Sequence, residues 1–137
     1  MKKKSEPAPQ KRLFYYTPLR YPGGKAKLAA FVKEIIVQND VSDGHYVEPY
    51  AGGAGIALEL LFNEYVNHIH INDVSRPVFA FWNCVLNHTE RLTRRIRDTK
   101  LSVATWDRQK RILGNPNDYD DEALGFATFF LNRTNRS

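Results

Sequence analysis

The sequence predicts an α/β fold that gives way to a helical region. Two short β-prone runs, His45-Tyr46-Val47 and Ile69-His70-Ile71-Asn72, each lead into an acidic residue, and a glycine-rich turn with an apolar helical pattern follows the first. After residue 74 the β-like runs stop, and helical patterns continue to residue 137. A strand–turn–helix–strand order is typical of a parallel sheet covered by helices, and the later helices are typical of an insertion into such a fold.

The first part of the chain contains a basic tail and two predicted helices. Residues 1–12 combine lysines and prolines without apolar periodicity, and we expect them to be disordered. A glycine turn at residues 22–24 opens a helix with the apolar face Leu28, Phe31, Val32, Ile35 and Ile36. The turn after Glu48 opens a second helix with the apolar face Ala54, Ala57, Leu58, Leu61 and Phe62. We therefore divide the chain into a tail (1–12), an α/β part (13–74) and a helical region (75–137).

Capping residues mark the helices expected in the second part. Three helices begin with a hydroxyl side chain suited to an N-cap: Ser75 for a helix to about Asn87, Thr89 for one through Arg97, and Ser102 for one towards Leu113. Residues 114–118 break the helical pattern. A final helix from about Asp121 carries the apolar face Ala123, Phe126, Ala127, Phe130 and Leu131.

Composition limits the classes of function. The net charge is +5 and the isoelectric point is near 9.4, which favours a polyanionic partner. The single cysteine, Cys84, excludes an internal disulfide and is expected to be a buried apolar side chain. No apolar run approaches membrane-spanning length, and there is no secretory signal pattern. We expect a cytoplasmic protein with no membrane partner and no metal site.

The turn after the first strand predicts a nucleoside site. Its glycines stand at positions 52, 53 and 55, whereas a dinucleotide site requires Gly-x-Gly-x-x-Gly. Glu48 would repel a phosphate by about 1–4 kcal/mol. Asp73, at the end of the next strand, is suited to a pair of ribose hydroxyls. S-adenosylmethionine satisfies both conditions because it carries a ribose, an ammonium and a sulfonium and no phosphate.

A second glycine turn follows the same logic. In Tyr21-Pro22-Gly23-Gly24-Lys25 the glycines permit close approach to a ligand, and a helix N-terminus favours an anion such as the methionine carboxylate. Tyr21 offers an aromatic face. Lys25 is placed to pair with a ligand carboxylate or with a DNA phosphate.

Together these segments resemble the Dam-like DNA adenine-N6 methyltransferases. The segments that match are Tyr21 to Lys25, Glu48 to Gly55, Asn72-Asp73, and Phe129 to Arg136. The resemblance covers residues 17–137. It implies a Rossmann-like S-adenosylmethionine-dependent methyltransferase fold, incomplete in this chain, with a helical insertion. The implied function is methyl transfer from S-adenosylmethionine to the N6 amine of adenine in double-stranded DNA, with an associated restriction endonuclease system left open.

The resemblance and the charge pattern indicate two sets of site residues. The cofactor set is Tyr21, Lys25, Glu48, Tyr50, Gly52, Gly55 and Asp73. The nucleic-acid set is Lys25, Arg91, Arg94, Arg95, Asn132 and Arg133. The three helical arginines have the spacing i, i+3, i+4, which suits a phosphate backbone, although a solvated helix face is the competing interpretation.

The sequence lacks the segment that would hold the adenine amine. An Asp-Pro-Pro-Tyr loop is expected for that role, and no two of the seven prolines are adjacent. We therefore expect no catalytic residue in this chain and regard it as an amino-terminal fragment that is inactive alone. The main alternative is a non-catalytic nucleic-acid-binding module. A dinucleotide-binding oxidoreductase is disfavoured by the glycine spacing and by Glu48.

Overall fold

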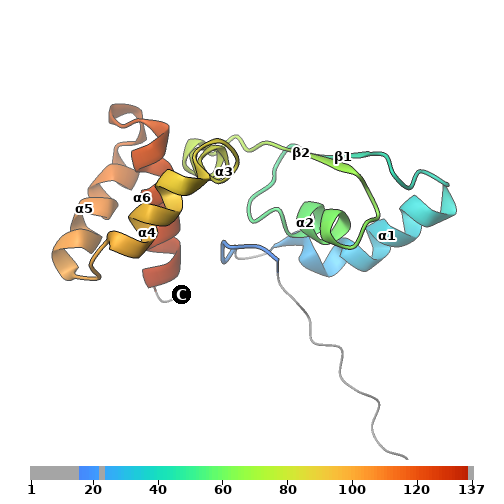
Figure 1. The fold of residues 1–137 in the computed structure, drawn as a ribbon, viewed down its shortest axis with the longest axis horizontal. Helices are drawn as coiled ribbons and strands as arrows, with labels where there is room; N and C mark the ends of the chain where they lie inside the picture. The colour runs from blue at the N-terminus through green and yellow to red at the C-terminus, as the bar shows by residue number, and fades with distance from the viewer. Residues whose placement is uncertain (1–15, 22–23, 136–137) are drawn as a thin grey trace, which may run out of the picture.

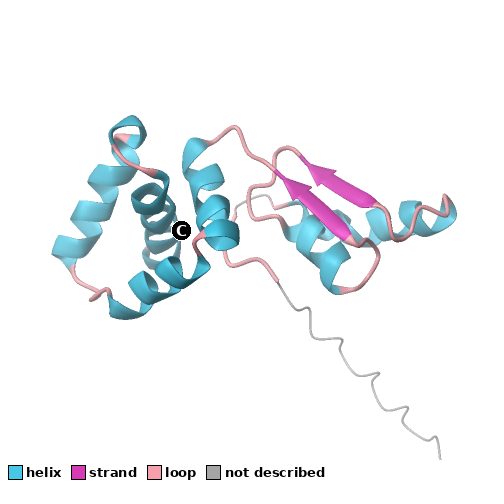
Figure 2. Ribbon diagram, turned by 45° about the horizontal axis from the view of Figure 1, so that its top comes forward, coloured by secondary structure: helices cyan, strands magenta, loops and turns pink. Residues whose placement is uncertain are grey.

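The computed structural model describes residues 16–21 and 24–135. The predicted disordered tail at residues 1–12 lies outside these ranges, as do Pro22, Gly23 and Arg136 of the predicted motifs. Within them the chain forms a small parallel sheet, two helices beside the sheet and a four-helix region beyond its end (Figures 1 and 2). The predicted mixture of α/β and helical parts is confirmed.

The sheet consists of β1 (His45–Glu48) and β2 (His68–Ile71). The strands are parallel and in register, so Glu48 lies opposite Ile71. Both predicted strands are confirmed, with the second displaced by one residue from the predicted run. The arrowheads of both strands point toward the helical region (Figure 2). The carboxyl ends of the strands, where the two acids were predicted, therefore meet the helices.

The first predicted helix forms, but its predicted apolar face is wrong in part. A 3₁₀ turn, η1 (Lys25–Leu28), leads into α1 (Ala29–Gln38). Ile36 is buried and Val32 is partly buried, whereas Leu28 and Phe31 are 53% and 62% exposed. The tighter 3₁₀ geometry changes the angular spacing of side chains in the first turn, and α1 packs on α2 rather than directly on the strands.

The second helix, α2 (Gly55–Phe62), lies on the same side of the strands as α1 (Figure 1). Ile56 and Leu60 are buried, although neither belongs to the predicted face, and Phe62 is 58% exposed. The predicted face is confirmed for Ala54 and Ala57, which are fully buried, and is wrong for Phe62, because α2 is covered from more than one side. One side packs against α1 and the strands, while Ala54 and Ala57 join the core shared with the helical region.

All four helices predicted for the helical region are present. They are α3 (Arg76–Asn87), α4 (Thr89–Asp98), α5 (Val103–Gly114) and α6 (Asp121–Thr134), with a short 3₁₀ turn, η2 (Pro116–Asp118), before α6. The predicted N-cap at Ser102 is confirmed, because its side chain accepts a hydrogen bond from Thr105 N. Ser75 precedes α3 without a side-chain cap, and His88 rather than Thr89 is the residue before α4.

One cluster of buried side chains connects the α/β part to the helical region. It contains Leu19, Ala51, Ala54, Ala57, Val78, Phe81, Trp82, Cys84, Leu92, Phe126, Phe130 and Leu131. Leu19 precedes η1, Ala51 and Ala54 belong to the turn after β1, and Ala57 belongs to α2. The other residues of the cluster come from α3, α4 and α6. The turn at the end of β1 is therefore held against the helices by apolar burial.

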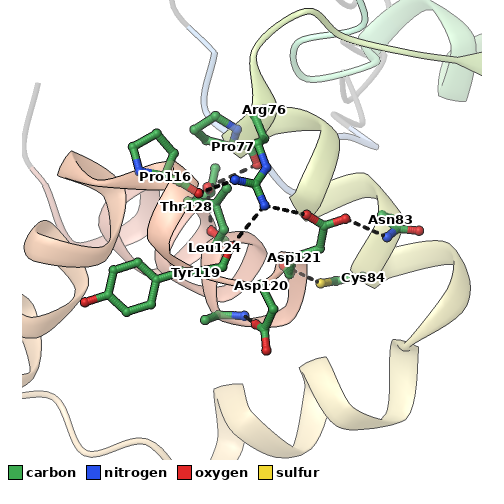
Figure 3. Close-up of polar contacts among 11 residues, drawn as sticks. Arg76, Pro77, Asn83, Cys84, Pro116, Tyr119, Asp120, Asp121, Leu124 and Thr128 are labelled. Carbon is green, nitrogen blue, oxygen red and sulfur yellow. Dashed lines mark hydrogen bonds and ion pairs between the residues drawn. The ribbon is translucent and has the colours of Figure 1, made fainter.

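Arg76, the first residue of α3, ties that helix to the start of α6 (Figure 3). Its guanidinium donates to the carbonyl oxygens of Pro116 and Tyr119 and lies 3.5 Å from Asp121 Oδ1. Asn83 donates to the other carboxylate oxygen of Asp121. Because Arg76 satisfies carbonyls that would otherwise lack partners, it stabilises the connection between α5 and α6.

Among the described residues, no helix is long and apolar enough to cross a membrane.

The α3–α6 contact depends on the absence of a side chain at Gly125. A methyl group there would lie 2.6 Å from the carbonyl oxygen of Ala80. We expect Gly125→Ala to lower the free energy of unfolding by about 1–3 kcal/mol, despite the higher helix propensity of alanine. Gly114→Ala is the control, since nothing lies within 4 Å of its added methyl group. Equal stability of the two variants in urea denaturation would contradict this packing.

The Cys84 thiol is expected to be inert in the folded chain. It is 1% exposed and donates to the carbonyl oxygen of Asp121. Burial, followed by the nearby Glu122, Asp121 and Asp120 carboxylates, raises the pKa of Cys84 from 9.0 to about 11.

Because the folded pKa is the higher one, the neutral thiol contributes stability below pH 9 that is lost as the pH rises through 11. A disulfide reagent at pH 8 should label the denatured chain within seconds and the native chain far more slowly. Rapid native labelling would contradict the buried position of Cys84.

Candidate functional site

The turn between β1 and α2 has a backbone conformation that requires glycine. Ala54 N donates to Ala51 O at 2.7 Å, which closes the turn. Gly52 has φ +51°, in the left-handed region that glycine adopts without steric cost. A Cβ atom at position 52 would also lie 3.0 Å from the Tyr21 ring. Ala54 adopts φ +49° without being glycine, so the turn holds local backbone strain next to the helix N-terminus.

Asp73 fixes this turn from the end of the second strand. Its Oδ2 accepts a hydrogen bond from Gly52 N at 2.8 Å, and its Oδ1 accepts one from Ser75 N at 2.9 Å. Backbone bonds continue the ladder past both strands, from Asn72 N to Glu48 O and from Ala51 N to Asn72 O. Each carboxylate oxygen has a second lone pair, so Asp73 retains acceptor capacity for a ligand hydroxyl.

Glu48 is buried behind the turn, with 3% of its side chain exposed. Its Oε2 accepts from Ala57 N at 3.2 Å, in the first turn of α2, where a negative charge is favourable. Lys25 Nζ lies 2.8 Å from Oε1 and also donates to the carbonyl oxygen of Tyr50. The Lys25 ammonium is therefore the partner of Oε1, which has no second partner within the described part of the chain. The remaining lone pair of this buried oxygen is available to a donor group of a ligand.

The other expected cofactor residues gather around the same turn. The Tyr21 ring lies against Gly52, and Tyr50 is exposed directly after β1. Gly55 permits the close approach of η1, because a Cβ there would lie 3.1 Å from Ala26 Cβ. The structure thus brings together all seven residues that the sequence analysis assigned to a cofactor.

The arginines predicted to bind nucleic acid have different surroundings. Arg91 forms an ion pair with Glu122, and the Arg95 guanidinium lies 4.5 Å from the centroid of the Phe126 ring. Both side chains therefore contact α6, and the hollow beside them has a volume of about 20 Å³, roughly that of one water molecule. Arg94 is exposed. Of the three arginines, Arg94 forms neither of these contacts with α6.

The two predicted nucleic-acid residues on α6 also differ. Asn132 Oδ1 accepts from Arg20 N at 2.8 Å, and Asn132 Nδ2 donates to Arg20 O at 2.7 Å. The side chain of Asn132 is therefore used within the chain. Arg133, the next residue, is exposed.

Sequence analysis missed one residue that touches the turn. Trp82 is a core residue that is 6% exposed. Its indole Nε1 also donates to Gly52 O at 2.8 Å. The polar N–H of a buried tryptophan requires an acceptor, which is the signal that was available in the sequence. No group of three or more possible metal ligands occurs among the described residues.

Comparison with known proteins identifies the family. Residues 21–119 match the family of D12 class N6 adenine-specific DNA methyltransferases. The chain belongs to this family. The match begins at Tyr21 and includes the turn after β1 and Asp73, so it contains all seven residues assigned to a cofactor. It ends before α6 and does not include Asn132 or Arg133. The resemblance inferred from the sequence is confirmed.

One curated relative allows the length of this chain to be compared with that of a known protein. The chain is 23% identical over 129 residues to the type II methyltransferase M.MjaIII of Methanocaldococcus jannaschii. The aligned region covers 85% of this chain and 44% of the relative, so the chain spans less than half the length of that protein. No solved structure gave a significant match.

Lys25 neutralises the buried Glu48, so removal of the lysine side chain should destabilise the fold. We expect Lys25→Met to lower the free energy of unfolding by about 1–3 kcal/mol, because the carboxylate loses its cation while remaining buried. Lys27→Met is the matched control from the same segment, since Lys27 is exposed and forms no ion pair among the described residues. Thermal denaturation of both variants measures the difference, and equal melting temperatures would show that Lys25 does not neutralise Glu48.

Proposed function

We propose that this chain is the cofactor-binding part of a site-specific DNA adenine-N6 methyltransferase that uses S-adenosylmethionine. Its strand–turn–helix–strand unit would belong to a Rossmann-like sheet, with residues 13–74 binding the cofactor and residues 75–137 leading to the DNA. Family membership supports the reaction class, and the relative length of M.MjaIII supports further sheet in a complete enzyme.

The observation that carries this proposal is the placement of two acids at the ends of adjacent parallel strands. Both accept hydrogen bonds from the backbone around one glycine turn, Asp73 from Gly52 and Glu48 from Ala57. Ligands of parallel α/β sheets bind at this edge. An acidic environment with no phosphate-binding glycine pattern favours a cationic nucleoside over a dinucleotide.

The residues present fit S-adenosylmethionine. The buried Oε1 of Glu48 and the exposed Tyr50 beside it would receive the cationic methionine part, while Asp73 would accept from the ribose hydroxyls. The left-handed Gly52 lets the backbone approach the ligand without a side chain in the way. Lys25 would balance Glu48 and contact the methionine carboxylate. When bound, the cofactor supplies an electrophilic methyl group.

Double-stranded DNA is the proposed macromolecular partner. The net charge of +5, together with the exposed Arg94 and Arg133, supports contacts to phosphates. Arg91 and Arg95 would also contact phosphates while keeping their contacts with α6. The name of the type II relative supports an associated restriction endonuclease as a second partner. A DNA substrate supports a cytoplasmic location.

Calorimetric titration distinguishes this function from its rivals. The purified chain should bind S-adenosylmethionine and not NAD. Asp73→Ala should weaken binding at least tenfold, because Gly52 N and Ser75 N lose their acceptor and the ribose loses one as well. DNA binding without any response to S-adenosylmethionine would favour the non-catalytic nucleic-acid-binding module instead. Preferential binding of NAD would favour the oxidoreductase.

The same chain is expected to transfer no methyl group. The sequence has no Asp-Pro-Pro-Tyr segment to hold the adenine amine. Incubation of the 137-residue chain with labelled S-adenosylmethionine and adenine-containing DNA should therefore leave the DNA unlabelled. Labelled N6-methyladenine would show that this chain contains its own catalytic residues.

A further inference from the structure

The side chain of Asn132 forms hydrogen bonds with both backbone polar groups of Arg20. Its side-chain amide accepts from Arg20 N at 2.8 Å and donates to Arg20 O at 2.7 Å. Asparagine is suited to this contact because its amide has one acceptor and one donor side by side. The pairing resembles one rung of a β-ladder and connects α6 to a segment 112 residues earlier in the sequence.

The segment held by Asn132, residues 17–21, covers the glycine turn. Leu19 is 3% exposed in the shared core, and Thr17 Oγ1 accepts from Leu19 N, which shapes the segment locally. Tyr21 follows directly after the clamped Arg20, and its ring lies against Gly52. Displacement of Arg20 would therefore move Tyr21 relative to the turn.

A second side chain of the helical region reaches the same turn. Trp82 of α3 donates its indole N–H to Gly52 O at 2.8 Å. Gly52 therefore accepts a hydrogen bond from Trp82 and donates one, through its N–H, to Asp73. Both polar groups of Gly52 are thus held, one by a strand end and one by a helix. Asn132 adds the segment that lies over this turn, from a different helix.

We propose that Asn132 is a positioning residue for the cofactor site and does not contact DNA. It orders residues 17–21 so that Tyr21 closes one side of the glycine turn, and it thereby couples α6 to cofactor affinity. The inference rests on the proposed function, because it concerns the same S-adenosylmethionine site. It reverses the role expected for Asn132 from the sequence and leaves that expected role to Arg133.

Four variants of α6 test the inference. Asn132→Ala removes both hydrogen bonds to Arg20. Asn132→Asp keeps the acceptor for Arg20 N but places a carboxylate beside Arg20 O. Arg133→Ala changes the adjacent exposed residue and leaves the contact with Arg20 intact. Thr128→Ala, which removes the bond from Thr128 to Pro77 O, is the control for a general loss of α6 packing.

Calorimetry with S-adenosylmethionine should show at least tenfold weaker binding for Asn132→Ala and Asn132→Asp. Arg133→Ala and Thr128→Ala should stay within twofold of the unmodified chain. Binding to a 20-base-pair duplex without cofactor should show the reverse order, with Arg133→Ala weakened and Asn132→Ala unchanged. The Arg20 amide should also exchange with solvent at least tenfold faster in Asn132→Ala, a readout that requires no ligand.

The outcomes separate the two levels of the proposal. If the unmodified chain binds no S-adenosylmethionine, the proposed function fails, and the positioning role fails with it. If the unmodified chain binds and Asn132→Ala binds equally well, only the positioning role is overturned. Weaker duplex binding by Asn132→Ala, with unchanged cofactor affinity, would return Asn132 to the nucleic-acid interface. If Asn132→Ala does not fold, Asn132→Asp decides by the same comparison.

Discussion

The hydrogen bond from Gly52 N to Asp73 Oδ2 is the contact on which the site depends. It joins the turn after β1 to the end of β2, so two strands that share a ladder also share a binding edge. Gly52 has a left-handed backbone that few residues adopt, and the carboxylate fixes its N–H in that conformation. Without this bond, the ends of the strands would still be adjacent, but the turn between β1 and α2 would lose the contact that orients Gly52 N.

The helical region supports the same turn from the opposite side. Trp82 fixes the carbonyl of Gly52, and the apolar core includes Ala51 and Ala54 of the turn together with Phe81 and Phe126 of the helices. The site is therefore formed where two parts of the chain meet, rather than within the α/β part alone. This arrangement gives a physical reason why a two-stranded sheet, too small to be stable by itself, retains an ordered turn.

The sequence was informative wherever local chemistry decides the structure. The strands that lead to Glu48 and Asp73, the cap at Ser102 and the glycine turn after β1 were predicted because each depends on a few neighbouring residues. The exposed face of α1 was not predicted, since Phe31 follows helical periodicity and its exposure depends on what packs against it. The bonds of Trp82 and Asn132 to distant backbone atoms were also missed. Residues 30 and 112 positions apart make these contacts, and no local pattern encodes such pairs.

The most direct measurement is hydrogen exchange of the backbone amides by nuclear magnetic resonance. An amide that donates to a carboxylate exchanges with solvent more slowly than an amide without an acceptor. The Gly52 and Ser75 amides should exchange at least tenfold faster in Asp73→Ala than in the unmodified chain. A Gly52 amide whose exchange does not change in Asp73→Ala would contradict the account, because the two strand ends would then lack the contact that forms the site.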